Sequence, residues 1–178
     1  MRLTFVLATS LLLAGAALPM ASAQSAASSK GEDRIVREVR HELVTLPYYS
    51  VFDNLAYKVD GYTVTLLGQV TRPTLKSDAE KNVRRIEGVE NVVNKIEVLP
   101  VSPMDDQIPR AVYRAIYSQP GLEMYSLRAV PTIHIIVKNG DVTLAGAVAD
   151  AGDKTRAGIA ANGVPNVFSV TNDLLVSP

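Results

Sequence analysis

The stretch Val64-Thr65-Leu66-Leu67-Gly68-Gln69-Val70 decides the fold, because its pattern returns 78 positions later as Val142-Thr143-Leu144-Ala145-Gly146-Ala147-Val148. From these two stretches onward the chain matches itself at the same offset without a gap. The matched pairs include Lys76 with Lys154, Ala79 with Ala157, Val89 with Val167, Val92 with Val170, Asn94 with Asn172 and Val98 with Val176. A constant offset indicates one structural unit used twice.

Both stretches are predicted to be β-strands. Val64, Leu66 and Val70 share one face, because side chains in a strand alternate with a period of two, and we expect this face to point into a core. Gly68 and its repeat Gly146 fall in the same row. A glycine inside a strand packs nothing itself, so its recurrence indicates either a closely approaching helix backbone or a bulge.

The residues around the first stretch complete a unit with the order helix, strand, strand, helix, strand. The first helix is amphipathic and should end before Pro47, since the residue before a proline avoids the helical conformation. Asp60-Gly61 marks the turn of a hairpin, and Pro73 suits the first turn of the second helix. The apolar positions behind this interpretation are Ile35, Val39 and Leu43, then Leu75, Ala79, Val83 and Ile86, then Val92, Ile96 and Val98.

The second unit repeats this order with an insertion. Ile108, Val112 and Ile116 match the first helix at an offset of 73, so about five extra residues lie between helix and strand, in the segment 119–131. Three glycines weaken its second helix by up to about 1 kcal/mol each. We therefore expect an α+β protein of two tandem domains, 32–99 and 105–178, each a three-stranded mixed sheet packed by two helices. A short semi-rigid linker, 100–104, joins them.

The pattern of residues at the N-terminus is typical of an export signal. Arg2 precedes an apolar run and the small-residue site Ala21-Ser22-Ala23, which predicts a signal peptide over 1–23 rather than an uncleaved anchor, with a flexible leader over 24–31. There is no cysteine, which excludes disulfides, thiolate metal sites and a lipidated N-terminal cysteine. Lys and Arg total 18, as do Asp and Glu, so no net charge attracts nucleic acid. We expect a soluble periplasmic protein.

The order helix, hairpin with V-x-L-x-G-x-V, helix, then G-V-x-x-V-x-N-x-I-x-V resembles the BON domain. The first unit carries it on Val64, Leu66, Gly68, Val70, Gly88, Val89, Val92, Asn94, Ile96 and Val98. The second carries it on Val142, Leu144, Gly146, Val148, Val167, Val170, Asn172, Leu174 and Val176, and departs at Asn166, where the family has glycine.

The resemblance implies a non-enzymatic module of the cell envelope. Similar proteins, sometimes called transport-associated, include soluble periplasmic tandem-domain proteins linked to osmotic stress, with chaperone-like action. Others are outer-membrane lipoproteins whose domain binds anionic phospholipid. Without a lipoprotein cysteine, this chain is similar to the soluble branch. Fold analogy alone does not choose its ligand.

Residues suited to catalysis or metal binding are sparse, and we expect no enzyme, no cofactor and no metal site. His41 and His134 lack a second ligand at metal-binding spacing, so solvent-exposed or structural roles are favoured. Asp105-Asp106 is better explained as a helix cap than as a metal ligand pair. The repeated Asn94 and Asn172 are better explained as partly buried amides that satisfy a turn or a helix end than as reactive groups.

Two surfaces remain as candidates for binding. The basic candidates are Arg34, Arg37, Arg40, Lys81, Arg84 and Arg85, although interleaved glutamates at ion-pairing spacing also fit an ordinary solvated helix face. The apolar candidates are Tyr48, Tyr49 and Phe52 in the first unit and Leu122, Met124, Tyr125 and Leu127 in the second. These loops either anchor into the protein's own core or form a membrane or partner surface.

The sequence thus favours an envelope module that binds anionic phospholipid through the loop aromatics and nearby cations. The alternative is a chaperone-like or scaffolding protein that holds exposed apolar segments of other exported proteins. The same apolar loops could serve both roles.

Overall fold

The computed structural model describes residues 21–100, 107–127 and 131–177, with side chains from residue 31 onward. Most of the expected signal peptide, most of the linker and the Asp105-Asp106 pair lie outside these residues. The first unit consists of α1 (Ala21–Val44), β1 (Asn54–Asp60), β2 (Thr63–Val70), α2 (Pro73–Val83), β3 (Asn91–Asn94) and β4 (Glu97–Val98).

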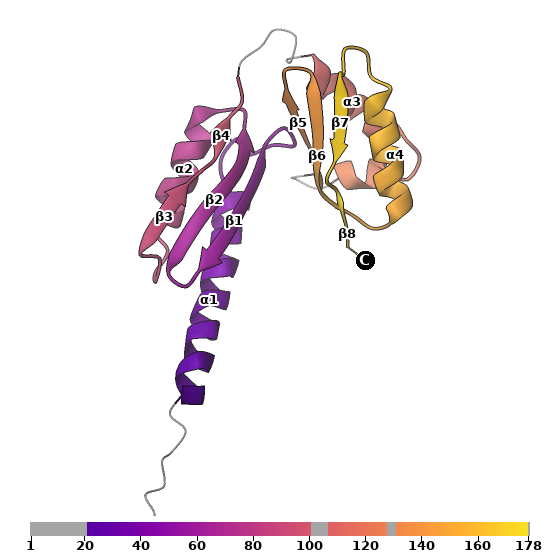
Figure 1. Cartoon of the computed structure of the whole chain (residues 1–178). Helices are drawn as coiled ribbons and strands as arrows, with labels where there is room; N and C mark the ends of the chain where they lie inside the picture. The colour runs from indigo at the N-terminus through magenta and orange to yellow at the C-terminus, as the bar shows by residue number, and fades with distance from the viewer. Residues whose placement is uncertain (1–20, 101–106, 128–130, 178) are drawn as a thin grey trace, which may run out of the picture.

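The second unit repeats these elements in the same order (Figure 1). It consists of α3 (Ile108–Tyr117), the 3-10 turn η1 (Glu123–Ser126), β5 (Ile133–Lys138), β6 (Asp141–Val148), α4 (Ala151–Asn162), β7 (Ser169–Asn172) and β8 (Leu175–Val176). The turn η1 lies in the predicted insertion. The expected tandem α+β architecture is confirmed.

Each sheet is mixed and centres on the strand that the repeat identifies. In the first sheet, β2 pairs antiparallel with β1 on one side and parallel with β3 and then β4 on the other. β6 pairs in the same way with β5, β7 and β8. β1 and β5 are therefore edge strands of their own sheets.

Both helices of a unit pack on the same face of its sheet. The first core joins Ile35 and Val39 of α1, Leu75 of α2, and Val64 and Leu66 of β2. The intervening Leu67 is 38% exposed, whereas Val64 and Leu66 are fully buried, as the alternation of side chains predicts. The second core repeats this arrangement around β6.

The repeated glycines meet the neighbouring strand of the hairpin. Gly68 has φ 111° and Gly146 has φ 115°, conformations that favour glycine. A Cβ at Gly68 would lie 2.0 Å from the Asn54 carbonyl oxygen, and one at Gly146 would lie 2.0 Å from that of Thr132. The expectation of a helix backbone or a bulge at these glycines is wrong, because the close atom belongs to the hairpin partner and the pairing register has no extra residue.

Replacing Gly146 with alanine should destabilise the protein by at least about 1–3 kcal/mol, the cost of a strained backbone conformation, before the steric clash is added. Gly163→Ala is the matched control, because its φ is −80° and an added Cβ meets neighbours at 3.7 Å. The control should be neutral or stabilising by up to about 1 kcal/mol. Urea unfolding measures both, and equal stabilities for the two variants would contradict this explanation.

The repeated asparagines join the last strand to the second helix. Between β3 and β4, the Asn94 Oδ1 accepts from the Ile96 N–H (3.1 Å), and the Asn94 amide donates to the Lys76 carbonyl (2.8 Å). Asn172 does the same with Leu174 (3.4 Å) and Lys154 (2.7 Å). These contacts satisfy backbone groups where the strand is interrupted.

Two local expectations need correction. Residues 24–31 belong to α1 instead of forming a flexible leader. Alanine is the best helix former and proline is absent over 21–31, so α1 extends toward the N-terminus beyond the part that packs on the sheet.

In the second unit, α4 is regular over Ala151–Asn162 despite its glycines. Asn166, with φ 69°, takes the left-handed conformation that Gly88 has at the equivalent place, with φ 89°.

Candidate functional site

The loop between α1 and β1, residues 45–53, reaches from the first unit to the second, and we call it the crossing segment. The Ile135 N–H on the edge of β5 donates to the Val51 carbonyl oxygen at 2.8 Å. The Val51 side chain is 7% exposed and belongs to the hydrophobic core of the second unit. The crossing segment therefore covers part of an edge strand and completes a core that is not its own.

A buried carboxylate fixes the shape of the crossing segment. Asp53 is fully buried, and its oxygens accept from the backbone N–H and hydroxyl of Ser50 at 3.0 and 2.7 Å. They also accept from the N–H and hydroxyl of Thr71 at 2.7 and 2.8 Å. A buried charge is tolerated when its lone pairs are bonded in this way, so Asp53 has a structural role.

Aromatic rings line the contact between the units. Tyr49 stacks on His134 with ring centroids 5.6 Å apart, and Phe52 meets Tyr113 edge to face at 6.3 Å. Burial raises the pKa of Tyr49 to about 12, and it also raises the pKa of Tyr117, whose hydroxyl donates to the Ile133 carbonyl. Both phenols remain neutral at physiological pH.

His134 is the titratable group most affected by this contact. Its Nδ1 is buried and has no hydrogen-bond partner among the residues that the structure describes. Burial lowers the pKa of His134 from the ordinary value of 6.5, against the opposing influence of the Asp53 and Ser50 backbone and the Asp53 carboxylate. The folded protein therefore holds this imidazole neutral near pH 7.

Lowering the pH below about 6.5 should weaken the contact between the units. The unfolded chain binds a proton at His134 more readily than the folded chain, so this contribution to stability is complete above pH 6.5 and is lost as the pH falls toward the lower folded pKa. His134→Phe keeps an aromatic ring against Tyr49 but removes the titrating group. When the unfolding temperature is measured between about pH 7.5 and about pH 5.5, it should fall less in His134→Phe than in the unmodified protein. His41→Gln is the control, and an unchanged slope in His134→Phe would contradict the assignment.

A cleft of about 690 Å³ opens beside this contact, between the crossing segment and α3. Its lining consists of Tyr49, Ser50, Val51, Phe52, Arg110, Tyr113, Arg114 and Pro131. Arg110 and Arg114 are exposed one helical turn apart, and the Arg114 Nε donates to the Arg110 carbonyl at 3.3 Å. Within the described residues neither guanidinium forms an ion pair. The cleft combines two cations with aromatic and apolar walls, which suits a ligand with an anionic head and an apolar body.

Neither arginine was among the basic contacts predicted from the sequence. Their i,i+4 spacing places them on one side of α3 beside Tyr113, and this pattern was available in the sequence. What the sequence did not contain was the position of the crossing segment, which forms the opposite wall of the cleft.

The predicted apolar surface divides into internal and exposed parts. Leu122 is fully buried in the second core, and Tyr49 and Phe52 pack against the two cores. Tyr48, Met124 and Leu127 are 71%, 58% and 83% exposed, and Arg72 lies 4.8 Å from the centre of the Tyr48 ring. The structure does not bring these residues together as one patch.

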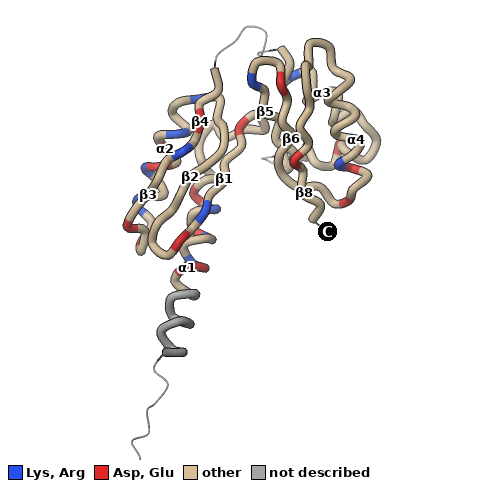
Figure 2. The backbone as a smooth tube through the Cα atoms, viewed as in Figure 1, with Lys and Arg blue, Asp and Glu red and all other residues tan. Residues whose placement is uncertain are grey.

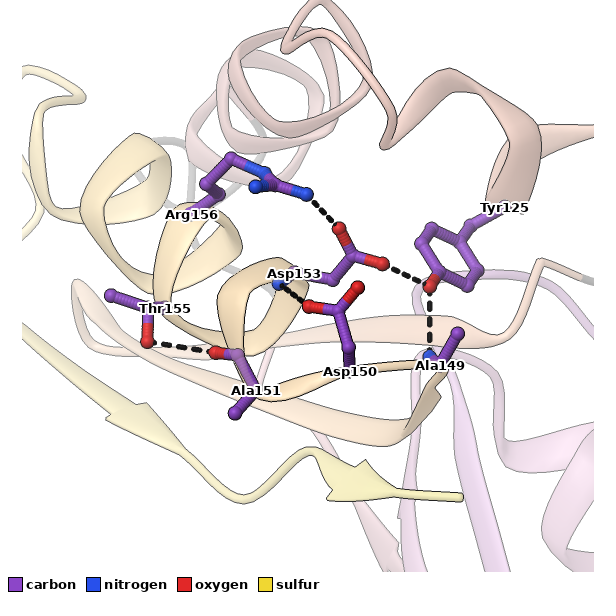
Figure 3. Close-up of polar contacts among 7 residues, drawn as sticks. All are labelled: Tyr125, Ala149, Asp150, Ala151, Asp153, Thr155 and Arg156. Atoms are coloured by element: carbon purple, nitrogen blue, oxygen red, sulfur yellow. Dashed lines mark hydrogen bonds and ion pairs between the residues drawn. The ribbon is translucent and has the colours of Figure 1, made fainter. Parts of the chain in front are cut away.

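Tyr125 is tied to the start of α4, as Figure 3 shows. Its hydroxyl donates to Asp153 at 2.5 Å and accepts from the Ala149 N–H at 2.8 Å. Arg156 pairs with the other Asp153 oxygen, and Asp150 caps the helix by accepting from the Asp153 N–H at 2.8 Å. Burial, followed by the Asp153 contact, raises the pKa of Tyr125. Tyr125 therefore anchors the inserted segment.

Tyr125→Phe should destabilise the protein by about 1.5–3 kcal/mol, because it removes a hydrogen bond to a charged, buried partner. Tyr62→Phe is the matched control, since Tyr62 is 55% exposed. Chemical unfolding measures the difference. Equal stabilities for the two variants would contradict the proposed role of Tyr125 in holding the inserted segment against α4.

Acidic residues occur among the predicted basic residues on α1 and α2, and Figure 2 shows both charges on these helices. Arg34 pairs with Glu38 at 3.1 Å and with Glu87 at 3.6 Å, and Arg84 pairs with Glu80 at 2.5 Å. The other four, Arg37, Arg40, Lys81 and Arg85, are exposed. Arg85 shares a cleft with glutamates of α1, so these residues do not form a continuous cationic face.

The described residues hold neither a metal-binding cluster nor a membrane-spanning helix. No three His, Asp or Glu side chains in this part of the chain gather closely enough to hold a metal ion. None of its helices has the length and apolar character needed to cross a membrane.

Comparison with known proteins identifies one domain family. The model of the BON domain matches the chain twice, over residues 31–100 and 105–178. No curated protein matches the chain. Among solved structures, the C-terminal domain of CdsD, a structural protein of the type III secretion system of Chlamydia trachomatis, matches at 12% identity with a TM-score of 0.33, covering 81% of this chain and 98% of that one. A second CdsD structure matches at 12% with a TM-score of 0.28, covering 82% and 93%.

Proposed function

Because this chain belongs to the BON-domain family and carries two such domains in tandem, we propose that it is an exported envelope protein that associates with anionic phospholipid. The observation that carries the proposal is the cleft beside the contact between the units, where Arg110 and Arg114 lie next to Phe52 and Tyr113. In this proposal the protein acts in the periplasm without a catalytic role, which the expected export signal and the family support.

The cleft offers each part of a phospholipid a suitable neighbour. A guanidinium binds phosphate through paired, charge-assisted hydrogen bonds. Tyrosine and phenylalanine rings suit the boundary between headgroup and acyl chain, where one side is wet and the other apolar. Each cation near an anionic surface contributes about 1 kcal/mol, so two arginines alone hold a membrane weakly and the apolar wall is needed as well.

The test is sedimentation of the protein with vesicles of phosphatidylglycerol and phosphatidylcholine, compared with phosphatidylcholine alone. Arg110→Gln combined with Arg114→Gln should weaken binding to the anionic vesicles about tenfold or more, since about 2 kcal/mol of attraction is removed. Binding should also weaken as salt rises.

Arg84→Gln is the matched control, because Arg84 is already paired with Glu80 on α2. It should bind the vesicles like the unmodified protein. Equal sedimentation with both kinds of vesicle, or an equal loss in the control, would reject the cleft as the lipid site.

A further inference from the structure

The crossing segment holds the edge of β5 from both faces of the second sheet. Ile135 points into the second core, so His134, its neighbour along the strand, points to the opposite face. Tyr49 stacks on His134 on that opposite face, whereas the Val51 side chain lies in the core on the helix face. The bond from the Ile135 N–H to the Val51 carbonyl lies at the edge between these contacts. The contacts on the two faces therefore support each other, because they belong to one short segment.

The outer face of β5 carries one group that titrates near neutral pH. His134, Ile136 and Lys138 alternate along this face. Lys138 pairs with Glu97 of β4 at 2.5 Å, and Ile136 is 4% exposed. Histidine is the side chain whose ordinary titration falls between about pH 5 and 8, so His134 is the group on this face whose charge can change there.

A protonated His134 lacks an acceptor in this contact. Both nitrogens of an imidazolium are donors, and the buried Nδ1 has no partner among the residues that the structure describes. Asp53 attracts a charged imidazole, but its carboxylate already accepts four hydrogen bonds from Ser50 and Thr71. These bonds fill the roughly four lone-pair positions of a carboxylate. Protonation would therefore bury an N–H without an acceptor, which is unfavourable.

The other groups packed around His134 do not supply that acceptor. His134 faces Ala145 across the β5–β6 pair and lies beside Gly146, and neither residue carries a charge. The Tyr49 phenol stays neutral, because burial raises its pKa to about 12. Backbone groups of the crossing segment and the Asp53 carboxylate favour the charged ring, but burial has the larger effect and lowers the pKa of His134. The described charged side chains of β1, β4, β6 and α3 are not among the influences on this pKa.

The cleft depends on the position of the crossing segment. Tyr49, Val51 and Phe52 line the cleft opposite Arg110 and Arg114 of α3. His134 is not a lining residue, so it acts on a bound molecule only through the crossing segment. Loss of the contact at His134 would move one wall of the cleft away from the two arginines.

We propose that His134 is a pH switch for the cleft: when its imidazole is protonated, the crossing segment leaves β5, the cleft loses one wall and the anionic ligand is released. The protein then holds anionic phospholipid near neutral pH and releases it in acid. The release of ligand rests on the proposed function, whereas the opening of the contact between the units does not.

Amide hydrogen exchange measures the opening on the unmodified protein without lipid. The protection factor of the Ile135 amide, which corrects for the intrinsic pH dependence of exchange, should fall by up to about tenfold between about pH 7.5 and about pH 5.5. This is the largest ratio that one proton with the ordinary histidine pKa of 6.5 produces over this range. The Leu99 amide is bonded to the Val70 carbonyl at 2.8 Å within the first unit, so its protection should not change. In His134→Phe the Ile135 amide should keep its protection as well.

Sedimentation with the phosphatidylglycerol and phosphatidylcholine vesicles tests the release. The unmodified protein should bind them up to about tenfold more weakly at about pH 5.5 than at about pH 7.5. General electrostatics predicts the opposite, because a protein with a formal net charge of 0 at pH 7 gains positive charge in acid. His134→Phe should show no weakening. His41→Gln is the matched control, since it changes the other histidine of the chain, and it should weaken like the unmodified protein.

Each arm can overturn the proposal. Equal protection of the Ile135 amide at both pH values, or an equal fall in His134→Phe, would overturn the switch. A fall at the Leu99 amide as well would mean that acid unfolds the protein generally, and it would overturn the switch too. Opening at Ile135 without weaker vesicle binding would show that the crossing segment is not needed to hold lipid, and it would overturn the release. Absence of vesicle binding at both pH values would reject the lipid site itself, and exchange at Ile135 would then decide the switch alone.

Discussion

The contact between the units depends on the outward Ile135 N–H of the edge strand β5, which needs an acceptor outside its own sheet. An edge strand must find acceptors for its outward N–H groups or leave them to water. Here the Val51 carbonyl meets the Ile135 N–H, and that bond positions the rest of the crossing segment. Tyr49 is brought against His134, and Phe52 against Tyr113. The cleft with its two arginines exists because this segment forms one of its walls.

The two units use different side chains to accept a hydrogen bond from the same backbone position, the N–H that follows the key strand. The N–H that follows the key strand belongs to Thr71 in the first unit and to Ala149 in the second, 78 positions later. Asp53 accepts from the first and the Tyr125 hydroxyl from the second. The carboxylate holds a loop that leaves its own unit, whereas the phenol holds an insertion against its own helix. In this chain, both units provide an acceptor for the N–H at this position, but the accepting side chain differs.

The sequence predicted the fold well, because strand alternation and helical stripes report burial within each unit. It placed the core residues Val64, Leu66 and Ile35 correctly, and both repeated stretches are β-strands as predicted. It identified Gly68 but not the Asn54 carbonyl beside it, since periodicity does not specify which backbone lies opposite. The site was less predictable. Arg110 and Arg114 form a candidate site because Val51 and Phe52 lie opposite them. A contact between units does not produce a periodic pattern of apolar residues, so the sequence did not predict it.

The buried Val51 has a consequence for how the halves could be exchanged between proteins. The repeat suggests two interchangeable blocks, yet one block supplies a core residue to the other. Recombination that moved the C-terminal block alone into a new host would leave a gap beside Ile135 and an exposed strand edge. The second unit therefore depends on the first for a complete core, although the sequence repeats as two similar blocks.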